Sequence, residues 1–270
     1  KFKSMTNINS PSPFNDFINN LKNSEIWFRV SIHDIKQRYK RSTIGPLWVT
    51  ISTSIIVFFL SVLYSQLFNV SLESYLPYIA VSIILWNLFS AIIIESCEVF
   101  VSSSQMLLQL RLPFYFYIFR LVSRNFIILL HNFILLLIIV FLYPNLININ
   151  YLIFLPISLI IYFLTGISIG MILGILCTRF RDITQIVINI IQLSFFLTPI
   201  LWKRDMIKSD NQWMIDINIF NHYLDIFRLA FLYQEYSYFS LLISIVFSLL
   251  IFIISFLMFN KFKKKINYWL

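Results

Sequence analysis

The sequence is poor in glycine and in charge. Its 270 residues include only 4 glycines, and 12% of them are charged. A soluble domain carries roughly 25% charged residues, so this chain has about half the usual share. With 59% hydrophobic residues and so few charges, the composition predicts an integral membrane protein.

The scarcity of glycine also excludes nucleotide-binding loops. The glycines are Gly45, Gly166, Gly170 and Gly174, and neither GxxxxGK[ST] nor GxGxxG occurs. We therefore expect no cofactor in this chain and no catalytic residues. If ATP and Mg²⁺ are used, a partner subunit binds them.

Metal ligands and buried carboxylates are scarce as well. The chain has 3 histidines and 2 cysteines, which are scattered, so no metal site is expected. The mid-membrane positions lack Asp and Glu, which argues against proton-coupled transporters and intramembrane hydrolases. The net charge of +9 is accounted for by the positive-inside bias and anionic lipids, so no nucleic-acid partner is expected.

The most informative stretch that is present runs from Asp34 to Trp48. Lys36, Arg38, Lys40 and Arg41 fall within six residues, and an uncharged apolar run to Phe68 follows closely. A basic cluster next to a membrane-length apolar run, with Trp at the junction, is typical of the cytoplasmic side.

The apolar runs predict an all-α membrane protein with six transmembrane helices. We place the spans near 44–68, 75–94, 114–142, 151–177, 183–202 and 239–259, within a transmembrane domain over 44–259. The cytoplasmic N-terminus is 1–43 and the cytoplasmic basic tail is 260–270. Most cations fall on the proposed inner side; the outer side keeps Lys203, Arg204, Lys208 and Arg228.

Three segments do not span. Residues 14–41 show an apolar stripe beside cations, which is typical of an amphipathic interface helix, although a solvated basic arm has the same composition. Segment 95–113 is polar on one side and suits a helix offered to a cytoplasmic partner. The outer segment 203–238 predicts two short re-entrant or gate helices, with an ordinary capping loop as the alternative.

Small and polar residues inside the spans need neighbours. Gly166, Gly170 and Gly174 form GxxxGxxxG, which predicts close helix packing, with a moving interface as the alternative. The mid-membrane polar side chains should face the bundle or a pore; they are His131, Asn132, Asn189 and Gln192.

Two blocks carry a family resemblance. His33-Asp34, Arg38-Tyr39-Lys40-Arg41-Ser42 and Ile44-Gly45-Pro46-Leu47-Trp48 resemble the start of the first span in type-2 ABC exporter permeases. The stretch Arg181-Asp182-Ile183 through Phe195-Phe196-Leu197-Thr198-Pro199-Ile200 is similar to the fifth span of the subgroup that exports O-antigen, capsule and teichoic acid polysaccharides. His222 stands where that subgroup often has Pro.

The resemblance implies a permease homodimer bound to two copies of a separate ABC ATPase in the bacterial cytoplasmic membrane. It also implies a channel with walls from the first and fifth spans. The cargo would be a polysaccharide linked to a polyprenyl pyrophosphate. A type-2 ABC permease for a drug or other lipid is the alternative. A membrane enzyme acting on polyprenyl-linked sugars is a further one; its carboxylates would be Glu95 and Glu98, although pairing with Arg111 or Arg124 explains them.

Three groups of residues are candidate sites. The pyrophosphate candidates are Arg38, Lys40 and Arg41, since Arg pairs bidentately with phosphate, with topology and lipid anchoring of the first span as the alternative. The channel-lining aromatic candidates are Phe58, Phe59, Tyr64, Phe195 and Phe196, with lipid contact or helix packing as the alternative. The candidates for coupling to the ATPase are Glu98, Gln105, Gln109 and Arg111.

Overall fold

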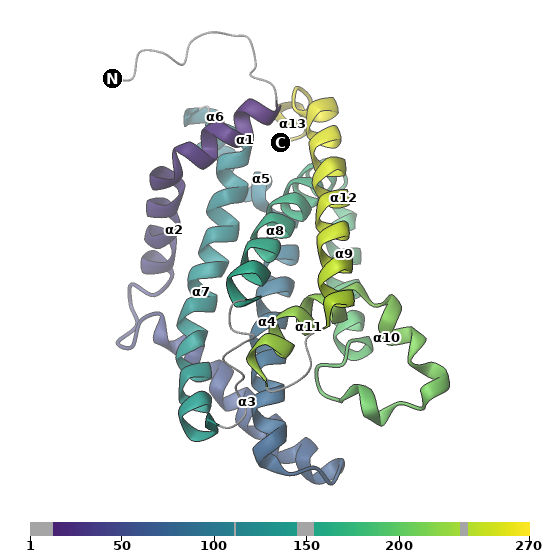
Figure 1. Cartoon of the computed structure of the whole chain (residues 1–270). Coiled ribbons are helices and arrows are strands. Elements are labelled where there is room, and N and C mark those ends of the chain that lie inside the picture. The colour runs from purple at the N-terminus through teal and green to yellow at the C-terminus, as the bar shows by residue number, and fades with distance from the viewer. Residues whose placement is uncertain (1–12, 111, 145–153, 233–236) are drawn as a thin grey trace.

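The computed structural model describes residues 13–110, 112–144, 154–232 and 237–270, and these residues form helices without strands (Figure 1). The N-terminal half holds α1 (Pro13–Lys22), α2 (Ser24–Arg38), α3 (Leu47–Leu67), α4 (Leu72–Cys97), α5 (Val99–Ser102), α6 (Ser104–Leu110) and α7 (Phe114–Leu142). The C-terminal half holds α8 (Phe154–Arg179), α9 (Asp182–Leu197), α10 (Trp213–Ile217), α11 (Ile219–Phe231), α12 (Tyr238–Phe262) and α13 (Ile266–Trp269).

Five of the described helices are long and apolar enough to cross a membrane: α3, α4, α7, α8 and α12. They coincide with predicted spans, and the span predicted over 114–142 matches α7 at both ends. This confirms an all-helical integral membrane protein. The sixth predicted span, 183–202, corresponds to α9, which has 16 residues. At 1.5 Å per residue α9 is about 24 Å long, shorter than a hydrocarbon core of about 30 Å.

The chain leaves the helical path after α9 because of a proline. Thr198 is extended, with φ −90° and ψ 139°, as expected for a residue that precedes proline. Pro199 has no N–H with which to continue the helical hydrogen bonds. The predicted end of this span at residue 202 is therefore five residues beyond the helix.

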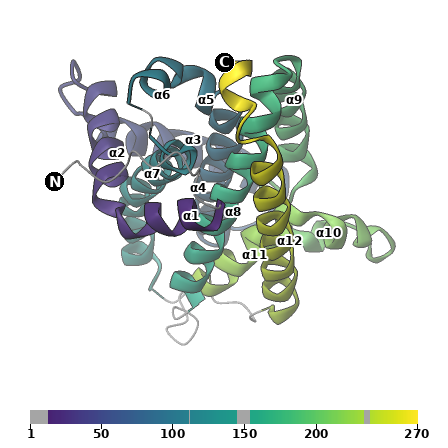
Figure 2. The ribbon, with the colours of Figure 1, turned by 90° about the horizontal axis from the view of Figure 1, so that it is seen from above.

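Helices α4 and α8 occupy the middle of the bundle in the view along its axis (Figure 2). In their most apolar stretches, 78% of α4 and 56% of α8 are buried, against 22% of α3 and 17% of α12. Helix α4 packs against α3, α7, α8 and α9. The bundle is thus built around α4, and α3 and α9 flank it with most of their surfaces uncovered.

Close packing of α8 explains its three glycines. A Cβ at Gly166 would lie 3.3 Å from Ile92, and one at Gly170 would lie 3.0 Å from Ile118. At Gly174 it would lie 2.8 Å from the Phe100 ring. The spacing of the glycines therefore serves close approach of α8 to its neighbours.

We expect Gly174→Ala to destabilise the protein more than Gly166→Ala. The methyl group at 174 would press on Phe100 and, at 2.9 Å, on Val99, whereas at 166 the nearest atom can yield by a few tenths of an ångström. Overpacking of this kind costs about 1–3 kcal/mol. Thermal unfolding of the two variants in the same detergent measures the difference, and equal melting temperatures would contradict the packing account.

The N-terminal segment forms two helices rather than the single interface helix predicted over 14–41. Asn23 separates α1 from α2. Helix α2 runs beside the first half of α7 instead of across its end (Figure 1). The Trp27 ring stacks on Phe119 at 5.2 Å, and the Ser31 hydroxyl donates to the Arg120 carbonyl at 2.8 Å. Burial of Trp27, Ser31 and Ile35 against the bundle holds this arrangement.

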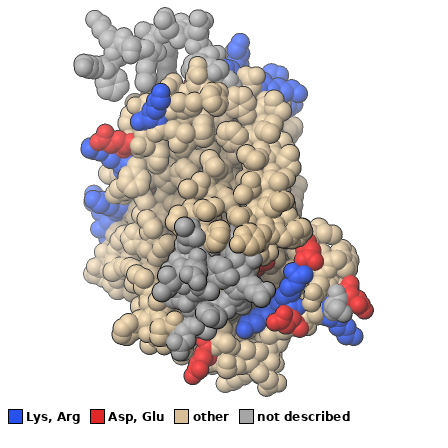
Figure 3. Space-filling model, viewed as in Figure 1, with Lys and Arg blue, Asp and Glu red and all other residues tan. Residues whose placement is uncertain are grey.

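Charged residues are sparse across the face seen in Figure 3, where they gather at the upper edge and left side and at the lower right. Helices α1 and α13 lie at the same end of the bundle (Figure 1). Within the predicted basic tail, α13 folds back onto α8, and the guanidinium of Arg179 lies 5.3 Å from the Trp269 ring centre.

The segment predicted to hold two short helices between residues 203 and 238 contains α10 and α11, together with two short 3-10 turns. Tyr223, Ile226 and Phe227 on α11 are buried. Helix α11 packs on α4, α8 and α12, so it belongs to the bundle rather than to a free loop.

Candidate functional site

A cluster of five charged residues joins α2, α4 and α7: Asp34, Arg38, Glu95, Arg120 and Arg124. We call it the ion-pair cluster. Arg120 donates to both oxygens of Asp34, from Nε at 2.5 Å and from Nη2 at 2.7 Å. Arg124 Nη1 lies 3.8 Å from the same carboxylate. A bidentate guanidinium–carboxylate pair fixes orientation as well as distance, so it locks α2 onto α7.

Glu95 is the second carboxylate of the cluster. Its Oε2 accepts from Arg124 Nη2 at 2.8 Å and from the Asn125 amide at 2.6 Å. Arg38 Nη2 lies 3.4 Å from Oε1, and the Arg38 side chain remains 47% exposed. Pairing with Arg111 or Arg124 was the structural alternative given for Glu95, and among the described residues it is Arg124 that pairs with it. With three guanidinium groups against two carboxylates, the cluster keeps one positive charge, and Arg38 is its loosest member.

A cavity of about 670 Å³ adjoins the cluster and is lined by residues of α2, α4, α5, α6 and α7. We call it the charged cavity. Three of the predicted coupling residues, Glu98, Gln105 and Gln109, line it and are exposed. The fourth, Arg111, lies outside the described residues. The described part of the predicted coupling segment, up to Leu110, thus forms a short polar wall at α5 and α6 next to the ion-pair cluster.

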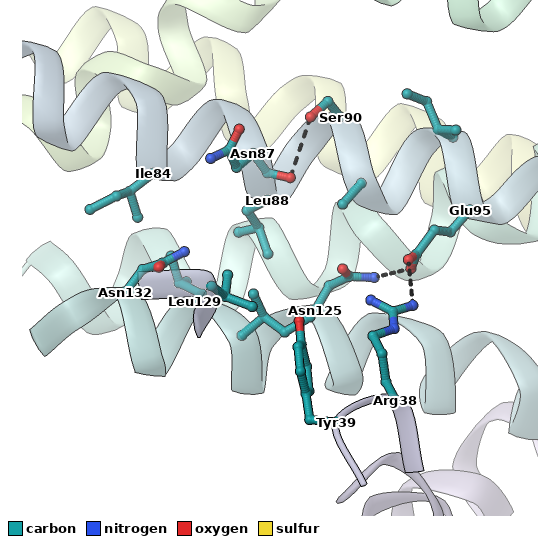
Figure 4. Close-up of a pocket in the computed structure, with 14 residues that line it drawn as sticks. Arg38, Tyr39, Ile84, Asn87, Leu88, Ser90, Glu95, Asn125, Leu129 and Asn132 are labelled. Atoms are coloured by element: carbon teal, nitrogen blue, oxygen red, sulfur yellow. Dashed lines mark hydrogen bonds and ion pairs between the residues drawn. The ribbon is translucent and has the colours of Figure 1, made fainter. Parts of the chain in front are cut away.

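A second cavity, of about 430 Å³, lies between the start of α3, α4 and α7 (Figure 4). We call it the amide cavity, because Asn87, Asn125 and Asn132 line it. Arg38 and Glu95 line both cavities. The ion pair that contains the most exposed side chain of the cluster, Arg38, therefore borders both cavities.

The remaining pyrophosphate candidates lie just past α2. Lys40 and Arg41 are exposed, and neither forms an ion pair within the described part of the chain. Gly45, with φ 63°, turns the chain into α3, which begins at Leu47. The three candidates Arg38, Lys40 and Arg41 thus lie within one short stretch, of which Arg38 lines the amide cavity and pairs with Glu95.

The aromatic candidates divide into two groups. Phe58 and Phe59 on α3 and Phe196 on α9 are 53%, 66% and 69% exposed. Tyr64 and Phe195 are half-buried; Tyr64 stacks on Phe68 at 5.7 Å, and Phe195 packs edge-on against Trp86 at 5.7 Å. The exposed three project from helices on either side of α4, so one copy of the chain does not bring them together.

Helix α9 also exposes a polar face. Gln185, Asn189 and Gln192 are exposed, and they recur at the i, i+4, i+7 spacing of one helix face. Gln185 donates to Asn189 at 3.3 Å. Amides turned to lipid would lack partners. This face therefore needs a second protein surface or a water-filled passage.

The break after α9 is held by side chains of α4 and α11. The Tyr78 hydroxyl donates to the carbonyls of Pro199 and Trp202, each at 2.8 Å. Arg228 Nη2, on a side chain that is 4% exposed, donates to the Pro199 carbonyl and to Ser82 Oγ, each at 2.9 Å. The guanidinium also lies 4.3 Å from the centre of the Tyr78 ring. Backbone that lost its helical partners is thus satisfied.

Two charged groups near this break are perturbed. Burial raises the pKa of Asp225, and Arg228, 3.5 Å away, opposes that rise by stabilising the carboxylate. Burial lowers the pKa of Lys203, although nearby Asp205 opposes the change. The Lys203 ammonium lies 5.5 Å from the Tyr78 ring centre. Asp225 on α11 and Lys203 in the segment after α9 are therefore charged groups that are partly shielded from water.

Sequence reasoning missed several of these residues. The sequence indicated Asp34 only as part of a family motif and did not predict its ion pair with Arg120. Asn87 was not predicted as a site residue. It lies near the middle of the second predicted span, where a polar amide should face the bundle or a pore for the same reason as Asn132. The burial of Arg228 was not predicted either, because the sequence placed this residue among the charges on the outer side of the membrane. Predicted polar residue Asn132 is indeed buried and faces a cavity.

Comparison with known proteins is consistent with this architecture. A family model described as ABC-2 type transporter matches residues 27–232. An O-antigen export system permease protein RfbA of Klebsiella pneumoniae is 25% identical over 232 residues, covering 85% of this chain and 89% of that protein. A second protein of the same description and organism is 25% identical over 187 residues, covering 68% and 71%.

Proposed function

The chain belongs to the ABC-2 type transporter family, and on that premise we propose that it is the permease subunit of an ATP-driven polysaccharide exporter. The family makes it a membrane transport subunit rather than an enzyme, with ATP hydrolysis in a separate partner. The cargo we propose is a glycan linked to a polyprenyl pyrophosphate, moved across the bacterial cytoplasmic membrane. The similarity to two O-antigen export permeases supports this cargo class.

The observation that carries the proposal is the uncovered surface on either side of α4. Amides on α9 and aromatic rings on α3 and α9 are exposed, so no other described helix of the same copy covers them. A homodimer in which these helices from both copies surround a passage would give the amides water and the rings a sugar surface. In this arrangement α9 counts as a sixth crossing, completed by the non-helical segment after Leu197.

The free energy of ATP hydrolysis would be transmitted to the permease at the end of the bundle that holds α5 and α6. We place the two ATPase copies there, on the cytoplasmic side with both termini, against the wall formed by Glu98, Gln105 and Gln109. The ion-pair cluster connects that wall to α2, α4 and α7, so a displacement of α5 or α6 would reach the spanning helices directly. At the opposite end, α10 and α11 would form the outer rim.

Copurification and ATP hydrolysis test the proposal. We expect a tagged permease, expressed with its genomic neighbours, to retain an ABC ATPase in stoichiometric amounts. We also expect lipid-linked glycan to stimulate ATP hydrolysis by that complex. A complex stimulated by an unglycosylated lipid or a drug, and not by the glycan, would favour the drug or lipid permease. Absence of any ATPase from the purified permease would contradict the proposal.

The three cations Arg38, Lys40 and Arg41 are proposed to hold the pyrophosphate. We expect replacement of all three by Gln to weaken binding of polyprenyl pyrophosphate about tenfold or more, since each charge-assisted hydrogen bond contributes about 1.5–3 kcal/mol. Binding is measured by native mass spectrometry of the purified complex. The matched control replaces three exposed cations near the C-terminus, Lys261, Lys264 and Lys265. Equal losses in the two variants would assign the first set to lipid anchoring alone.

The exposed aromatic residues are proposed to line the passage. We expect Ala at Phe58, Phe59 and Phe196 together to reduce glycan export about tenfold while leaving the melting temperature unchanged, because ring contacts each contribute about 0.5–1.5 kcal/mol and these rings are exposed in one copy. Phe141→Ala is the control, since that ring is 86% exposed on α7. Normal export by the triple variant would contradict this role. Tyr64 and Phe195 are left intact because they pack within the chain.

A further inference from the structure

The amide cavity has the properties of a ligand-binding site. Its volume of about 430 Å³ falls within the roughly 300–1,000 Å³ of small-ligand pockets. Arg38, Tyr39, Glu95 and the three Asn side chains contribute polar groups, and aliphatic residues of α4 and α7 supply the rest of the lining (Figure 4).

Two amide side chains in the cavity have no evident structural role. Asn132 is 2% exposed, yet its Oδ1 has no hydrogen-bond partner among the described residues. Asn87 is exposed on a helix that is otherwise largely buried, and its side chain forms no hydrogen bond with the described residues. Figure 4 places them on opposite walls, Asn87 on α4 and Asn132 on α7. A buried, unpaired amide oxygen costs free energy.

The depth of these amides within the spanning helices increases the free-energy cost of leaving them unpaired. Asn87 and Asn132 each lie eight residues from the ion-pair cluster along their helices, counted from Glu95 and Arg124. At 1.5 Å per residue they are about 12 Å from it, toward the middle of the spanning helices. Polar side chains at such depth are typical of functional sites.

The chemistry of the lining favours a neutral, hydroxyl-bearing ligand. An Asn amide offers one acceptor and two donors, so it can pair with a hydroxyl acting in either role. An anion is disfavoured deep in the cavity, because the Glu95 carboxylate stands at one end and the walls beyond are amide, hydroxyl and aliphatic. Arg38, at the same end as Glu95, is the one cation of the lining.

We infer that the amide cavity binds the sugars nearest to the lipid in the transported glycan. The inference rests on the proposed function and deepens it. With the pyrophosphate at Arg38, the adjoining sugars enter the cavity, and their hydroxyl groups pair with Asn87 and with the free oxygen of Asn132. Tyr39, whose hydroxyl points toward the cavity in Figure 4, presents its ring beside the first sugar. The permease thereby distinguishes a glycosylated lipid from the bare carrier.

A comparison of two lipids tests this inference. The probes are a polyprenyl-pyrophosphate disaccharide and polyprenyl pyrophosphate without sugar, each bound to the permease–ATPase complex in nanodiscs. We expect the wild-type complex to prefer the disaccharide lipid. We expect Asn87→Ala and Asn132→Leu each to reduce that preference about tenfold, as for loss of a hydrogen bond that leaves a partner unpaired. Affinity for the bare lipid should stay unchanged, which also verifies folding.

The control and the contrary outcomes are separable. Asn260→Leu alters an exposed amide on α12, far along the chain from the cavity lining, and should leave both affinities unchanged. Equal wild-type affinity for the two lipids, or an undiminished preference in both cavity variants, would overturn the inference and leave the proposed function standing. A wild-type complex that binds neither lipid would overturn the proposed function itself.

Discussion

Arg120→Met is expected to lower the free energy of unfolding by about 2–3 kcal/mol and to release α2 from the bundle. Breaking a buried ion pair costs about 3–5 kcal/mol because a charge is left unpaired. The loss here is smaller, since the side chains of Arg120 and Asp34 are 23% and 12% exposed and Arg124 stays within 3.8 Å of Asp34. Thermal unfolding in detergent measures the loss, and limited proteolysis between α2 and α3 reports the release.

A double-mutant cycle separates the charge effect from lost packing. Asp34→Asn combined with Arg120→Met removes both charges, so it should be less destabilising than Arg120→Met alone. Arg29→Met is the matched control, because the ion pair of Arg29 with Glu25 joins side chains that are 76% and 72% exposed. Exposed pairs contribute little. A double variant as unstable as the sum of its parts would show that Asp34 and Arg120 do not support each other.

Arg228→Leu is expected to have the largest effect at the opposite end of the bundle, a loss of about 3–5 kcal/mol. The change removes the donor to Pro199 and Ser82, leaving a carbonyl without its charged partner, and takes the counter-charge from buried Asp225. The segment after α9 and helix α11 should loosen together. Hydrogen exchange of residues 198–203 and 219–231 measures this, and unchanged protection there would contradict the account.

The loss in Arg228→Leu should shrink as the pH falls. Burial raises the pKa of Asp225 above its usual range, and Arg228 is the first of the groups that oppose the rise; His222, Asn221 and Arg204 also do so. A carboxyl with a raised pKa in the folded state binds its proton more tightly there, so stability increases as the pH falls through that pKa toward the lower pKa of the unfolded chain. Removing Arg228 strengthens this dependence, and lowering the pH from about 7.5 to 5 should recover part of the loss.

The pH effect has its own control. In the variant with Asp225→Asn as well as Arg228→Leu, the titrating carboxyl is absent, so the recovery at acidic pH should disappear. Melting temperatures of the single and double variants across the pH range give the comparison. An equal pH dependence in both would assign it to other groups.

The sequence predicted best where hydrophobic length decides the structure. The span at 114–142 was placed correctly because Pro113 precedes it, Pro144 follows it and the run between them is apolar. The glycine spacing on α8 predicted close packing because only backbone contact requires such residues at every fourth position. For Glu95 the sequence offered pairing with Arg111 or Arg124 as the alternative to a catalytic role, and the structure has the pair with Arg124.

Contacts between distant segments could not be read in the same way. Asp34 and Arg120 are 86 residues apart, and nothing local indicates that α2 runs beside α7. The end of α9 was predicted too late because apolar residues continue to Trp202, whereas the chain is released from helical hydrogen bonding at Pro199 and is held instead by Tyr78 and Arg228. The amide cavity likewise needed three helices to be placed before Asn87 and Asn132 could be seen to share it.

Reconstituted transport tests the central claim most directly. The permease and its ATPase are placed in vesicles that contain a fluorescent polyprenyl-pyrophosphate glycan, and the fraction of glycan accessible to a glycosidase on the far side is followed. We expect that fraction to rise only with ATP and Mg²⁺, and to rise less with Ala at Phe58, Phe59 and Phe196. A complex that hydrolyses ATP while the accessible fraction stays constant would contradict the claim that this chain is a glycan-exporting permease.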